Sequence, residues 1–284
     1  MENIGIIGNG FVGSAIAHGF SLHGNIRIYD LDPIKSTHSI AEVVNGSKFI
    51  FVSVPTPMKN VLGGDIDTSI MYSVFDEISE INDRDDNIFI VKSTIVPGTM
   101  EKLIERYPLL NIIHSPEFLT ERSARLDFIN ASRIILGGDP PLLDEVEGLL
   151  RERFPYIQVI KTDVTTAQFI KYMANCFFAT KVSFMNEMKQ AANVLNVDWD
   201  DAMRGLITDG RIGNSHLDVP GHDGYNGFGG KCFPKDLNAF IGLFKQVGVD
   251  PKVMTSVWDK NLEVRQEYDW RSIEGAVSKG EENE

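Results

Sequence analysis

The sequence has only two cysteines, Cys176 and Cys232, and it has no long apolar run. Two cysteines are too few for a disulfide framework and are typical of a reducing compartment. The longest apolar stretches, such as Phe49–Val54, are far shorter than the roughly 18–20 residues that span a bilayer. Met1–Gly8 leads directly into a strand pattern, without the basic segment and apolar stretch of a signal peptide. We therefore expect a cytoplasmic protein that makes no membrane contact.

Basic residues are also in short supply, because the formal net charge is −13. Binding to nucleic acid or to an anionic membrane surface needs a basic face, so we expect neither kind of partner. A small anionic ligand is not excluded, since a few local donors can hold it. The six histidines are scattered and neither cysteine has a C-x-x-C partner. The sequence therefore predicts no metal site.

Short apolar runs alternate with helical segments in the first half of the chain. The helical segments include Ser69–Ile81 and Thr99–Arg106, which are amphipathic. The strand-like runs are Ile4–Ile7, Ile26–Tyr29, Phe49–Val54, Ile88–Val91, Asn111–His114, Arg133–Leu136 and Ile157–Ile160. They are continuous rather than alternating, as expected for parallel strands that are buried on both faces. This order predicts an α/β fold with a doubly wound sheet of the Rossmann type.

The pattern becomes helical after about residue 161. Residues 164–195 contain neither proline nor glycine and predict one long helix. Further helices are expected at residues 199–207, 235–247 and 253–268. The Gly-rich stretch Gly210–Gly230 predicts a loop that is either functional or disordered, and the acidic tail at 278–284 predicts a frayed end. We therefore expect an α/β domain at residues 1–161 and an all-α domain with a long helix at residues 162–284.

A glycine turn follows the first strand and opens a helix. Its glycines permit a tight turn, close approach of the backbone to a pyrophosphate and close packing of helix on strand. Asp30 ends the second strand, where a carboxylate accepts hydrogen bonds from ribose hydroxyls and repels a 2′-phosphate, which favours NAD. Lys35 is either a solvated lysine or a neighbour of the adenosine. The turn residues predicted to bind NAD are Gly8, Gly10, Phe11, Val12 and Gly13. The alternative, a chance glycine turn, is weakened by the strand, helix and acidic residue around it.

Two more polar segments follow strands of the predicted sheet. They are Val54-Pro55-Thr56-Pro57 and Ser93–Pro97. In open parallel sheets, ligands bind beyond the carboxyl ends of the strands. Thr56 and Thr94 are therefore predicted to face the nicotinamide half of the cofactor, unless the prolines merely end the strands.

Two segments offer acid–base groups. Glu117 and Glu121 lie four residues apart after a strand, and on pattern alone they indicate a solvated helix start. Lys171 and Asn175 are also four residues apart and share one face of the long helix. Apolar neighbours would partly desolvate Lys171, and desolvation lowers the pKa of a lysine so that it can take part in proton transfer. An exposed surface lysine is the alternative.

Cys232 differs from Cys176 in its surroundings. Cys176 lies mid-helix beside phenylalanines, as a buried inert thiol does, whereas Cys232 follows a Gly-rich loop and precedes a helix. A helix N-terminus lowers the pKa of a thiol and favours a nucleophilic thiolate. Lys235 adds positive potential there, and Asp236 is expected one turn further on as a base or an orienting group.

Together these segments resemble the UDP-glucose/GDP-mannose dehydrogenase family, and in particular its UDP-sugar 6-dehydrogenase branch. The matching segments extend from residue 4 to about residue 240 in the family's order. The most specific is the run Phe228–Asp236, with the sequence Phe-Gly-Gly-Lys-Cys-Phe-Pro-Lys-Asp. The resemblance implies a metal-free oxidation of a UDP-sugar 6-hydroxyl to a carboxylate, with two NAD⁺, and a role in polysaccharide biosynthesis.

The resemblance also assigns roles by position. Cys232 would form the thiohemiacetal and thioester, Glu117 would activate water, and Thr94 would hold a water molecule. Lys171, Asn175 and Asp236 would polarise the sugar oxygens and shuttle protons. Further cofactor contacts would come from Val54, Pro55, Thr56, Thr94, Glu121 and Lys235. The sugar nucleotide would be lined by Glu117, Phe118, Leu119, Thr120, Glu121, Lys171, Asn175, Arg211, Tyr225, Phe228 and Gly229.

The resemblance further implies a homodimer that pairs through the long helix, with Arg211 reaching a neighbouring site. Members of the family carry a second Rossmann-like domain that binds much of the nucleotide, and this sequence ends near its expected start. A short natural form, a fragment, and an enzyme with a separate UDP-binding chain are all consistent with that length. Two other functions remain open, namely a two-electron β-hydroxyacid dehydrogenase and a non-catalytic NAD-binding or assembly subunit.

Overall fold

The computed structural model describes residues 1–59, 65–273 and 275–278. Its chain forms two compact units. The first comprises Met1–Thr56 and Thr68–Lys171, and the second comprises Pro57–Asp67 and Tyr172–Glu284. Most of the acidic tail at 278–284, which we expect to be a frayed end, lies outside the described residues.

The first unit is built around a parallel-dominated sheet. Within its described residues the sheet has seven strands in the order β2-β1-β3-β4-β5-β6-β7. These are β1 (Glu2–Ile7), β2 (Gly24–Tyr29), β3 (Phe49–Val52), β4 (Ile88–Val91), β5 (Asn111–His114), β6 (Arg133–Gly137) and β7 (Gln158–Thr162). The order reverses between β1 and β3, and open α/β sheets bind ligands at such a switch point. The predicted doubly wound α/β fold is confirmed.

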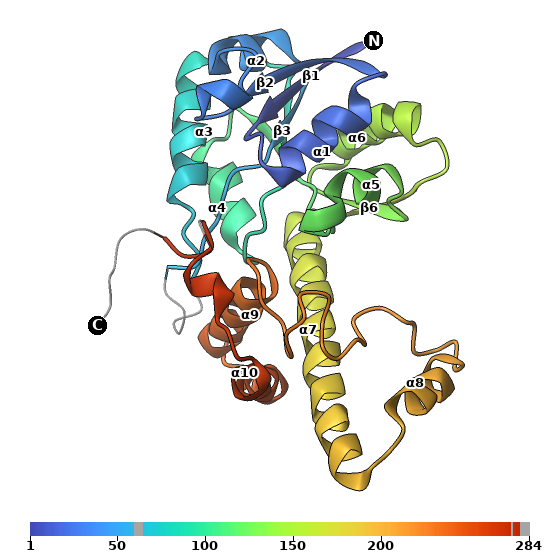
Figure 1. Cartoon of the computed structure of the whole chain (residues 1–284). Coiled ribbons are helices and arrows are strands. Elements are labelled where there is room, and N and C mark those ends of the chain that lie inside the picture. The colour runs from blue at the N-terminus through green and yellow to red at the C-terminus, as the bar shows by residue number, and fades with distance from the viewer. Residues whose placement is uncertain (60–64, 274, 279–284) are drawn as a thin grey trace. The chain divides into compact units, whose positions relative to one another are not determined.

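Helices cover both faces of this sheet (Figure 1). They are α1 (Phe11–Phe20), α2 (Ile40–Gly46), α3 (Ser69–Ile81), α4 (Thr99–Arg106), α5 (Ala124–Ile129) and α6 (Pro140–Arg153), with the short 3₁₀ helices η1 (Pro33–Lys35) and η2 (Glu121–Ser123). One core joins α1, α5 and α6 to the strands through rings such as Phe20, Phe51 and Phe128. On the other face, Phe75 of α3 packs on Phe89 of β4 with ring centroids 6.0 Å apart. Burial on both faces explains why the strands read as continuous apolar runs.

The direction of β6 differs from the expectation of parallel strands. β6 pairs with β5 antiparallel, through His114 and Gly137, and β7 then runs parallel to β6. A continuous apolar run indicates that a strand is buried on both faces, but it carries no information about the direction of its neighbour. The prediction of parallel strands was therefore wrong at this one pairing.

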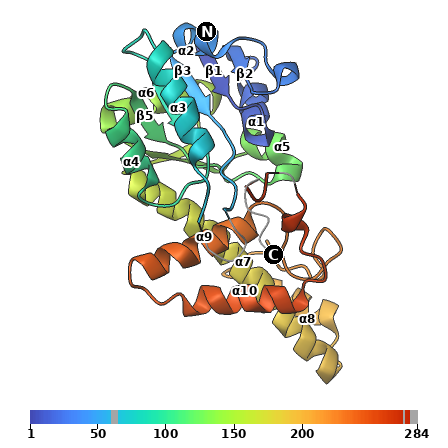
Figure 2. The same ribbon diagram turned by 90° about the vertical axis from the view of Figure 1, so that its left-hand side faces the viewer.

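The second unit is helical in the part that the structure describes. Its helices are α7 (Val164–Leu195, which begins in the first unit), α8 (Trp199–Ile207), α9 (Phe233–Gln246) and α10 (Lys252–Val264), followed by the 3₁₀ helix η3 (Asp269–Arg271). Figure 2 shows α9 and α10 side by side. Ser183 of α7 donates a hydrogen bond to the backbone oxygen of Val257 in α10 at 2.9 Å. The predicted long helix is observed over its full expected range.

Candidate active site

The glycine turn after β1 has the packing that a nucleotide-binding turn requires. Gly8 has φ +90°, and a Cβ atom there would lie 2.5 Å from the backbone oxygen of Ser53. A Cβ atom on Gly13 would collide with the backbone oxygen of Gly8, so α1 approaches the turn only with glycine at this position. Nothing lies within 4 Å of a Cβ built on Gly10, which caps α1 without a side-chain hydrogen bond. The first N–H groups of α1 are thus open to an anion, and the turn fits a pyrophosphate.

Asp30 is held beside this turn by backbone N–H groups. Its carboxylate accepts a hydrogen bond from the backbone nitrogen of Asn9 at 2.6 Å and one from that of Asp32 at 2.9 Å. Each carboxylate oxygen keeps a lone pair for a further donor, such as a ribose hydroxyl. Lys35 is exposed, and its backbone oxygen accepts a hydrogen bond from the Asn9 side chain at 2.9 Å. The cofactor contacts expected of Asp30 and Lys35 stay predictions.

The loops that follow β3 and β4 are joined by side-chain hydroxyls. Thr56 Oγ1 donates to the backbone oxygen of Thr94 at 2.7 Å, and Ser93 Oγ donates to the backbone oxygen of Val54 at 2.7 Å. Pro55, which stands between Val54 and Thr56 in the chain, is exposed. The two predicted nicotinamide-side segments are therefore in direct contact at the carboxyl edge of the sheet.

A buried ion pair lies in the first unit. Lys171 Nζ is 3.1 Å from Glu117 Oε1, and the two side chains are only 4% and 7% exposed. The other carboxylate oxygen, Oε2, accepts a hydrogen bond from the backbone nitrogen of Leu119 at 2.6 Å. Glu121, in contrast, is exposed at the start of η2. The two glutamates are thus in different environments, and the solvated helix start describes only Glu121.

Lys92 belongs to the same group of charges and was not among the predicted residues. Its Nζ donates to Ser115 Oγ at 3.0 Å and to the backbone oxygen of Pro116 at 3.4 Å. Burial lowers the pKa of Lys92 to about 8; the nearby Glu117 opposes this shift and Lys171 adds to it. The sequence does hold a signal for this residue, because a lysine directly follows the buried run of β4 at the carboxyl edge of the sheet.

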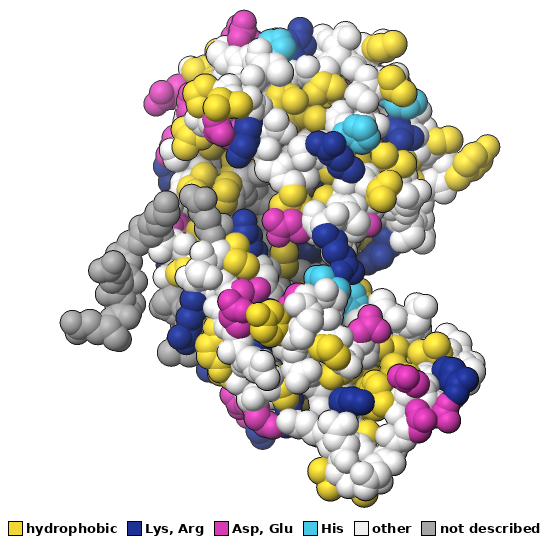
Figure 3. Space-filling view, viewed as in Figure 1, with side chains coloured by type: hydrophobic (Ala, Val, Ile, Leu, Met, Phe, Trp, Pro, Cys, Tyr) yellow, Lys and Arg dark blue, Asp and Glu magenta, His cyan; other side chains and the backbone are white. Residues whose placement is uncertain are grey.

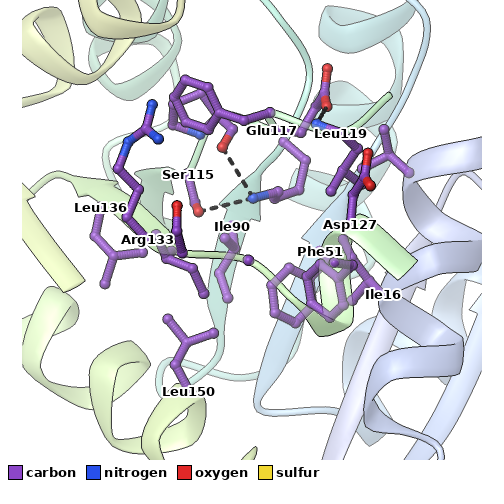
Figure 4. Close-up of a pocket in the computed structure, with 18 of the residues that line it drawn as sticks. Ile16, Phe51, Ile90, Ser115, Glu117, Leu119, Asp127, Arg133, Leu136 and Leu150 are labelled. Atoms are coloured by element: carbon purple, nitrogen blue, oxygen red, sulfur yellow. Dashed lines mark hydrogen bonds between the residues drawn. The ribbon is translucent and has the colours of Figure 1, made fainter. Parts of the chain in front are cut away.

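A cavity of about 310 Å³ opens beside these charges within the first unit. Figure 4 shows Ser115, Glu117 and Arg133 on one side of it and apolar core residues such as Leu150 on the other. Phe118 also lines it, with the Arg133 guanidinium 4.7 Å and Lys171 Nζ 5.4 Å from its ring centroid. Of the other predicted sugar residues nearby, Leu119 lines the cavity and Thr120 is exposed.

In the second unit, the carboxylate of Asp236 is shared between two donors. Asn175 Nδ2 donates to Oδ2 at 2.5 Å, and Lys235 Nζ donates to Oδ1 at 2.5 Å. All three residues are buried. Tyr172 is buried one turn before Cys176, and burial, together with the charge of Asp236, raises the pKa of its hydroxyl. Asp236 is therefore held in one orientation as the partner of an amide and an ammonium.

Cys232 is the N-cap residue of α9 and is half-buried. Its backbone oxygen accepts a hydrogen bond from the backbone nitrogen of Asp236 at 2.8 Å, so the carboxylate lies one turn into the same helix. The positive end of the helix dipole stabilises a thiolate at this position. Cys176 is buried within α7, and burial raises the pKa of its thiol. The two cysteines thus differ in burial, and the nucleophilic role of Cys232 stays a prediction.

The remaining predicted substrate residues lie in the second unit. Arg211 is exposed and pairs with Asp209, while Tyr225 is 37% exposed. Phe228 is buried, with its ring centroid 6.0 Å from that of Phe233. Gly229 is half-buried. Their contacts with a sugar nucleotide stay predictions.

In residues 1–59, 65–273 and 275–278, no group of three or more His, Cys, Asp or Glu side chains is arranged to hold a metal ion. No helix in the same part of the chain has the length and apolar character that crossing a membrane requires.

The sequence matches two models of one protein family. Residues 27–149 match the NAD binding domain of the UDP-glucose/GDP-mannose dehydrogenase family, and residues 165–263 match its central domain. The chain therefore carries an NAD-binding domain. The UDP-glucose 6-dehydrogenase of Rickettsia bellii is 32% identical over 239 residues, which are 81% of this chain and 52% of that protein. The chain thus spans about half the length of the curated relatives that it matches.

Solved structures give the same picture of the fold. A UDP-glucose dehydrogenase from the hyperthermophilic archaeon Pyrobaculum islandicum superimposes with a TM-score of 0.78 at 25% identity, over 93% of this chain and 68% of that one. A 3-hydroxyisobutyrate dehydrogenase from Mycobacterium tuberculosis gives a TM-score of 0.73 at 16% identity, over 93% of both chains. At that identity, the second likeness describes the fold alone.

Proposed function

Because the chain belongs to the UDP-glucose/GDP-mannose dehydrogenase family, we propose that it is the catalytic part of an NAD-dependent oxidoreductase that converts a UDP-sugar 6-hydroxyl to a carboxylate. The position of Cys232 carries this proposal. It caps α9, and Asp236, one turn further on, is bonded to Asn175 and Lys235. A two-electron dehydrogenase has no use for such a thiol. UDP-glucose is the simplest substrate, since it is named in the matching relatives.

In the proposed reaction, Cys232 retains the sugar between two oxidations. NAD⁺, when bound, accepts a hydride in each oxidation, so two NAD⁺ are reduced for each sugar. After the first oxidation, Cys232 Sγ adds to the aldehyde carbon, and the carbonyl oxygen takes a proton to give a thiohemiacetal. Loss of a second hydride and of the hydroxyl proton gives a thioester, and water then displaces the thiolate to form the carboxylate. The covalent bond prevents release of a reactive aldehyde.

The remaining polar groups suit the proton transfers of these steps. Glu117 would accept a proton from the attacking water, and Lys171, whose Nζ lies 3.1 Å from the Glu117 carboxylate, would stabilise the oxyanion. Asn175 and Asp236 would hold and polarise the sugar oxygens. Thr94 would hold a water molecule at the carboxyl edge of the sheet.

We assign binding roles by the same reasoning. The turn Gly8–Gly13 and Asp30 would hold the pyrophosphate and the ribose, with Lys35 beside the adenosine. Further cofactor contacts would come from Val54, Pro55, Thr56, Thr94, Glu121 and Lys235. The sugar nucleotide would contact Glu117, Phe118, Leu119, Thr120, Glu121, Lys171, Asn175, Arg211, Tyr225, Phe228 and Gly229. In this scheme residues 1–161 act as the NAD-binding domain and residues 162–284 as the central domain.

An apolar stripe on α7 supports a homodimer. Met173, Phe177 and Phe184 share one side of the helix and are 52%, 61% and 56% exposed. Figure 3 shows hydrophobic side chains at the surface over the lower part of α7 and over α8. Exposed apolar patches of this kind mark association surfaces. We propose pairing through α7, with Arg211 reaching the partner's site.

The proposal also names a further partner and a location. A separate UDP-binding chain is part of it. The low cysteine content supports action in the cytoplasm.

Counting NADH separates the proposed function from its alternatives. The protein is incubated with NAD⁺ and a panel of UDP-sugars, alone and after Cys232→Ser. The proposal predicts two NADH for each sugar consumed and loss of this turnover in Cys232→Ser. A β-hydroxyacid-type enzyme would release one NADH for each molecule of a β-hydroxyacid, added in a parallel assay, and would keep this activity in Cys232→Ser. An NAD-binding subunit would bind the cofactor and turn over none of the sugars.

A further inference from the structure

The Gly-rich loop that leads to Cys232 is bonded to three buried or half-buried side chains from other elements of the second unit. Gly227 N–H donates to Asn186 Oδ1 in α7 at 3.2 Å. Phe228 N–H donates to Asn261 Oδ1 in α10 at 2.7 Å. Gly230 N–H donates to Asp269 Oδ2 at 3.0 Å. These bonds satisfy backbone donors that an irregular loop cannot pair within itself.

Asn261 makes the most complete of these contacts. It is fully buried, and its Nδ2 donates back to the Phe228 backbone oxygen at 3.0 Å. One side-chain amide therefore binds both the N–H and the C=O of one loop residue, as a neighbouring strand would. The fit is close, because a Cβ atom on Gly227, which has φ +70°, would collide with Asn261 Oδ1. This backbone position is thus fixed by a side chain from α10.

Arg265, one turn after Asn261, holds the second half of the same loop. Its buried guanidinium lies 2.8 Å from Asp223, within the loop, and 3.3 Å from Asp269, the partner of Gly230 at the end of the loop. A Cβ atom on Gly229 would collide with both Arg265 and Asp269. The loop consequently closes around the end of α10 before the chain enters α9.

We propose that Asn261 and Arg265 are positioning residues for Cys232. Gly230, the last loop residue that they control, stands two positions before the cysteine. By fixing the backbone there, they align Cys232 on the N-terminus of α9, where the helix dipole stabilises its thiolate. The role in the reaction rests on the proposed function, whereas the effect on the thiol is a property of the protein alone.

Alkylation of the full-length chain by iodoacetamide tests this without any substrate. The rate at Cys232 is followed by peptide mass spectrometry across a pH series, and the buried Cys176 reports unfolding in the same samples. Asn261→Ala and Arg265→Gln are expected to raise the midpoint of the Cys232 profile by about one pH unit, which slows alkylation at neutral pH about tenfold. Arg265→Lys, which keeps the charge, is expected to fall between Arg265→Gln and the wild type.

Two matched controls separate positioning from general loss of stability. Ser183→Ala removes another buried side-chain hydrogen bond to α10 that does not involve the loop, and it should leave the Cys232 midpoint unchanged. Gly227→Ala and Gly224→Ala both place alanine at positive φ, but Gly224 has open space around its Cβ position. Only Gly227→Ala should therefore shift the midpoint.

The outcomes distinguish this proposal from the proposed function. Wild-type midpoints in Asn261→Ala and Arg265→Gln, or shifts that merely follow each variant's loss of thermal stability, would overturn the positioning role. Shifted midpoints in a protein that turns over no UDP-sugar would leave the positioning role intact and reject the proposed function.

Discussion

Asn175 Nδ2 lies 2.5 Å from Asp236 Oδ2, and this contact joins α7 to α9 inside the second unit. Lys235 occupies the other oxygen of the same carboxylate. The amide of Asn175 donates to Asp236 and still offers its oxygen to another ligand. Asn175, which lies one turn after Lys171 on α7, thus helps to fix the orientation of Asp236.

Replacing Asn175 with aspartate should make catalysis depend on acid. At neutral pH two carboxylates would face each other, and kcat should fall about 100-fold because a positioned donor is lost. Activity should recover in part as the pH falls, since the introduced carboxyl group, once protonated, donates as the amide did. Steady-state rates against pH provide the measurement. The matched change Asn238→Asp removes a buried hydrogen bond that a side-chain amide donates to a backbone oxygen within α9. No recovery of activity at low pH is expected in that variant.

Two glycines of the cofactor turn should respond differently to alanine. Gly10→Ala places its Cβ in open space at an ordinary φ, so thermal stability should be unchanged, while NAD⁺ binding weakens about tenfold or more because the methyl group occupies the approach of the pyrophosphate. Gly8→Ala meets the Ser53 oxygen at positive φ and should destabilise the fold itself. Thermal melting and calorimetric titration with NAD⁺ measure both effects. Equal NAD⁺ affinity in Gly10→Ala and the wild type would place the cofactor elsewhere.

The buried pair of Glu117 and Lys171 should be strongly coupled in stability. Lys171→Met leaves a buried carboxylate without its ammonium and should reduce the free energy of unfolding by about 3 kcal/mol or more. Adding Glu117→Gln should recover much of that loss, because the second change removes the unpaired charge. Urea unfolding of the two single variants and the double variant gives the coupling.

A surface pair is the control for this cycle. Lys161 is 39% exposed and pairs with Asp144 and Glu147, so Lys161→Met should leave the free energy of unfolding almost unchanged. Additive effects of Lys171→Met and Glu117→Gln would show that the two groups do not interact in solution.

Lys92 should make stability rise with pH in the alkaline range. Burial lowers its pKa in the folded protein to about 8 from the ordinary 10.5. Between these two pH values the unfolded chain binds more protons than the folded one, so the free energy of unfolding rises with pH. The stability that depends on Lys92 is fully present above pH 10.5 and is lost as the pH falls through about 8. Lys92→Met should abolish this dependence and should be more stable than the wild type near pH 7. Urea unfolding of both proteins from pH 7 to pH 10 measures the difference, and parallel pH curves would refute it.

Most of the fold was predictable because its signals are local. Most strands of the first unit contain a short apolar run, and the proline- and glycine-free residues 164–195 form α7 as expected. The antiparallel direction of β6 was not predictable, because it depends on the path of the connection from β5 and not on the residues of either strand.

The site was predictable only in part, because some of its contacts join residues that are far apart in the sequence. Cys232 could be identified because it lies between a Gly-rich loop and a helix. Lys171 and Asn175 could be identified because they share one helix face. Asn261 reads as an ordinary helix residue, and its role depends on a loop residue 33 positions earlier in the chain. Lys92 was missed because a lysine after a strand is usually solvated, whereas here Ser115 and Pro116 enclose it.

Mass spectrometry of Cys232 during turnover is the most direct test of the proposed thioester on this residue. The Glu117→Gln protein, in which hydrolysis should be slow, is mixed with NAD⁺ and UDP-glucose, quenched and digested. A sugar-nucleotide acyl group is expected on the peptide that contains Cys232; hydroxylamine should release it, and the Cys232→Ser protein should lack it. An unmodified Cys232 peptide, together with carboxylate formation that survives Cys232→Ser, would contradict the proposed thioester.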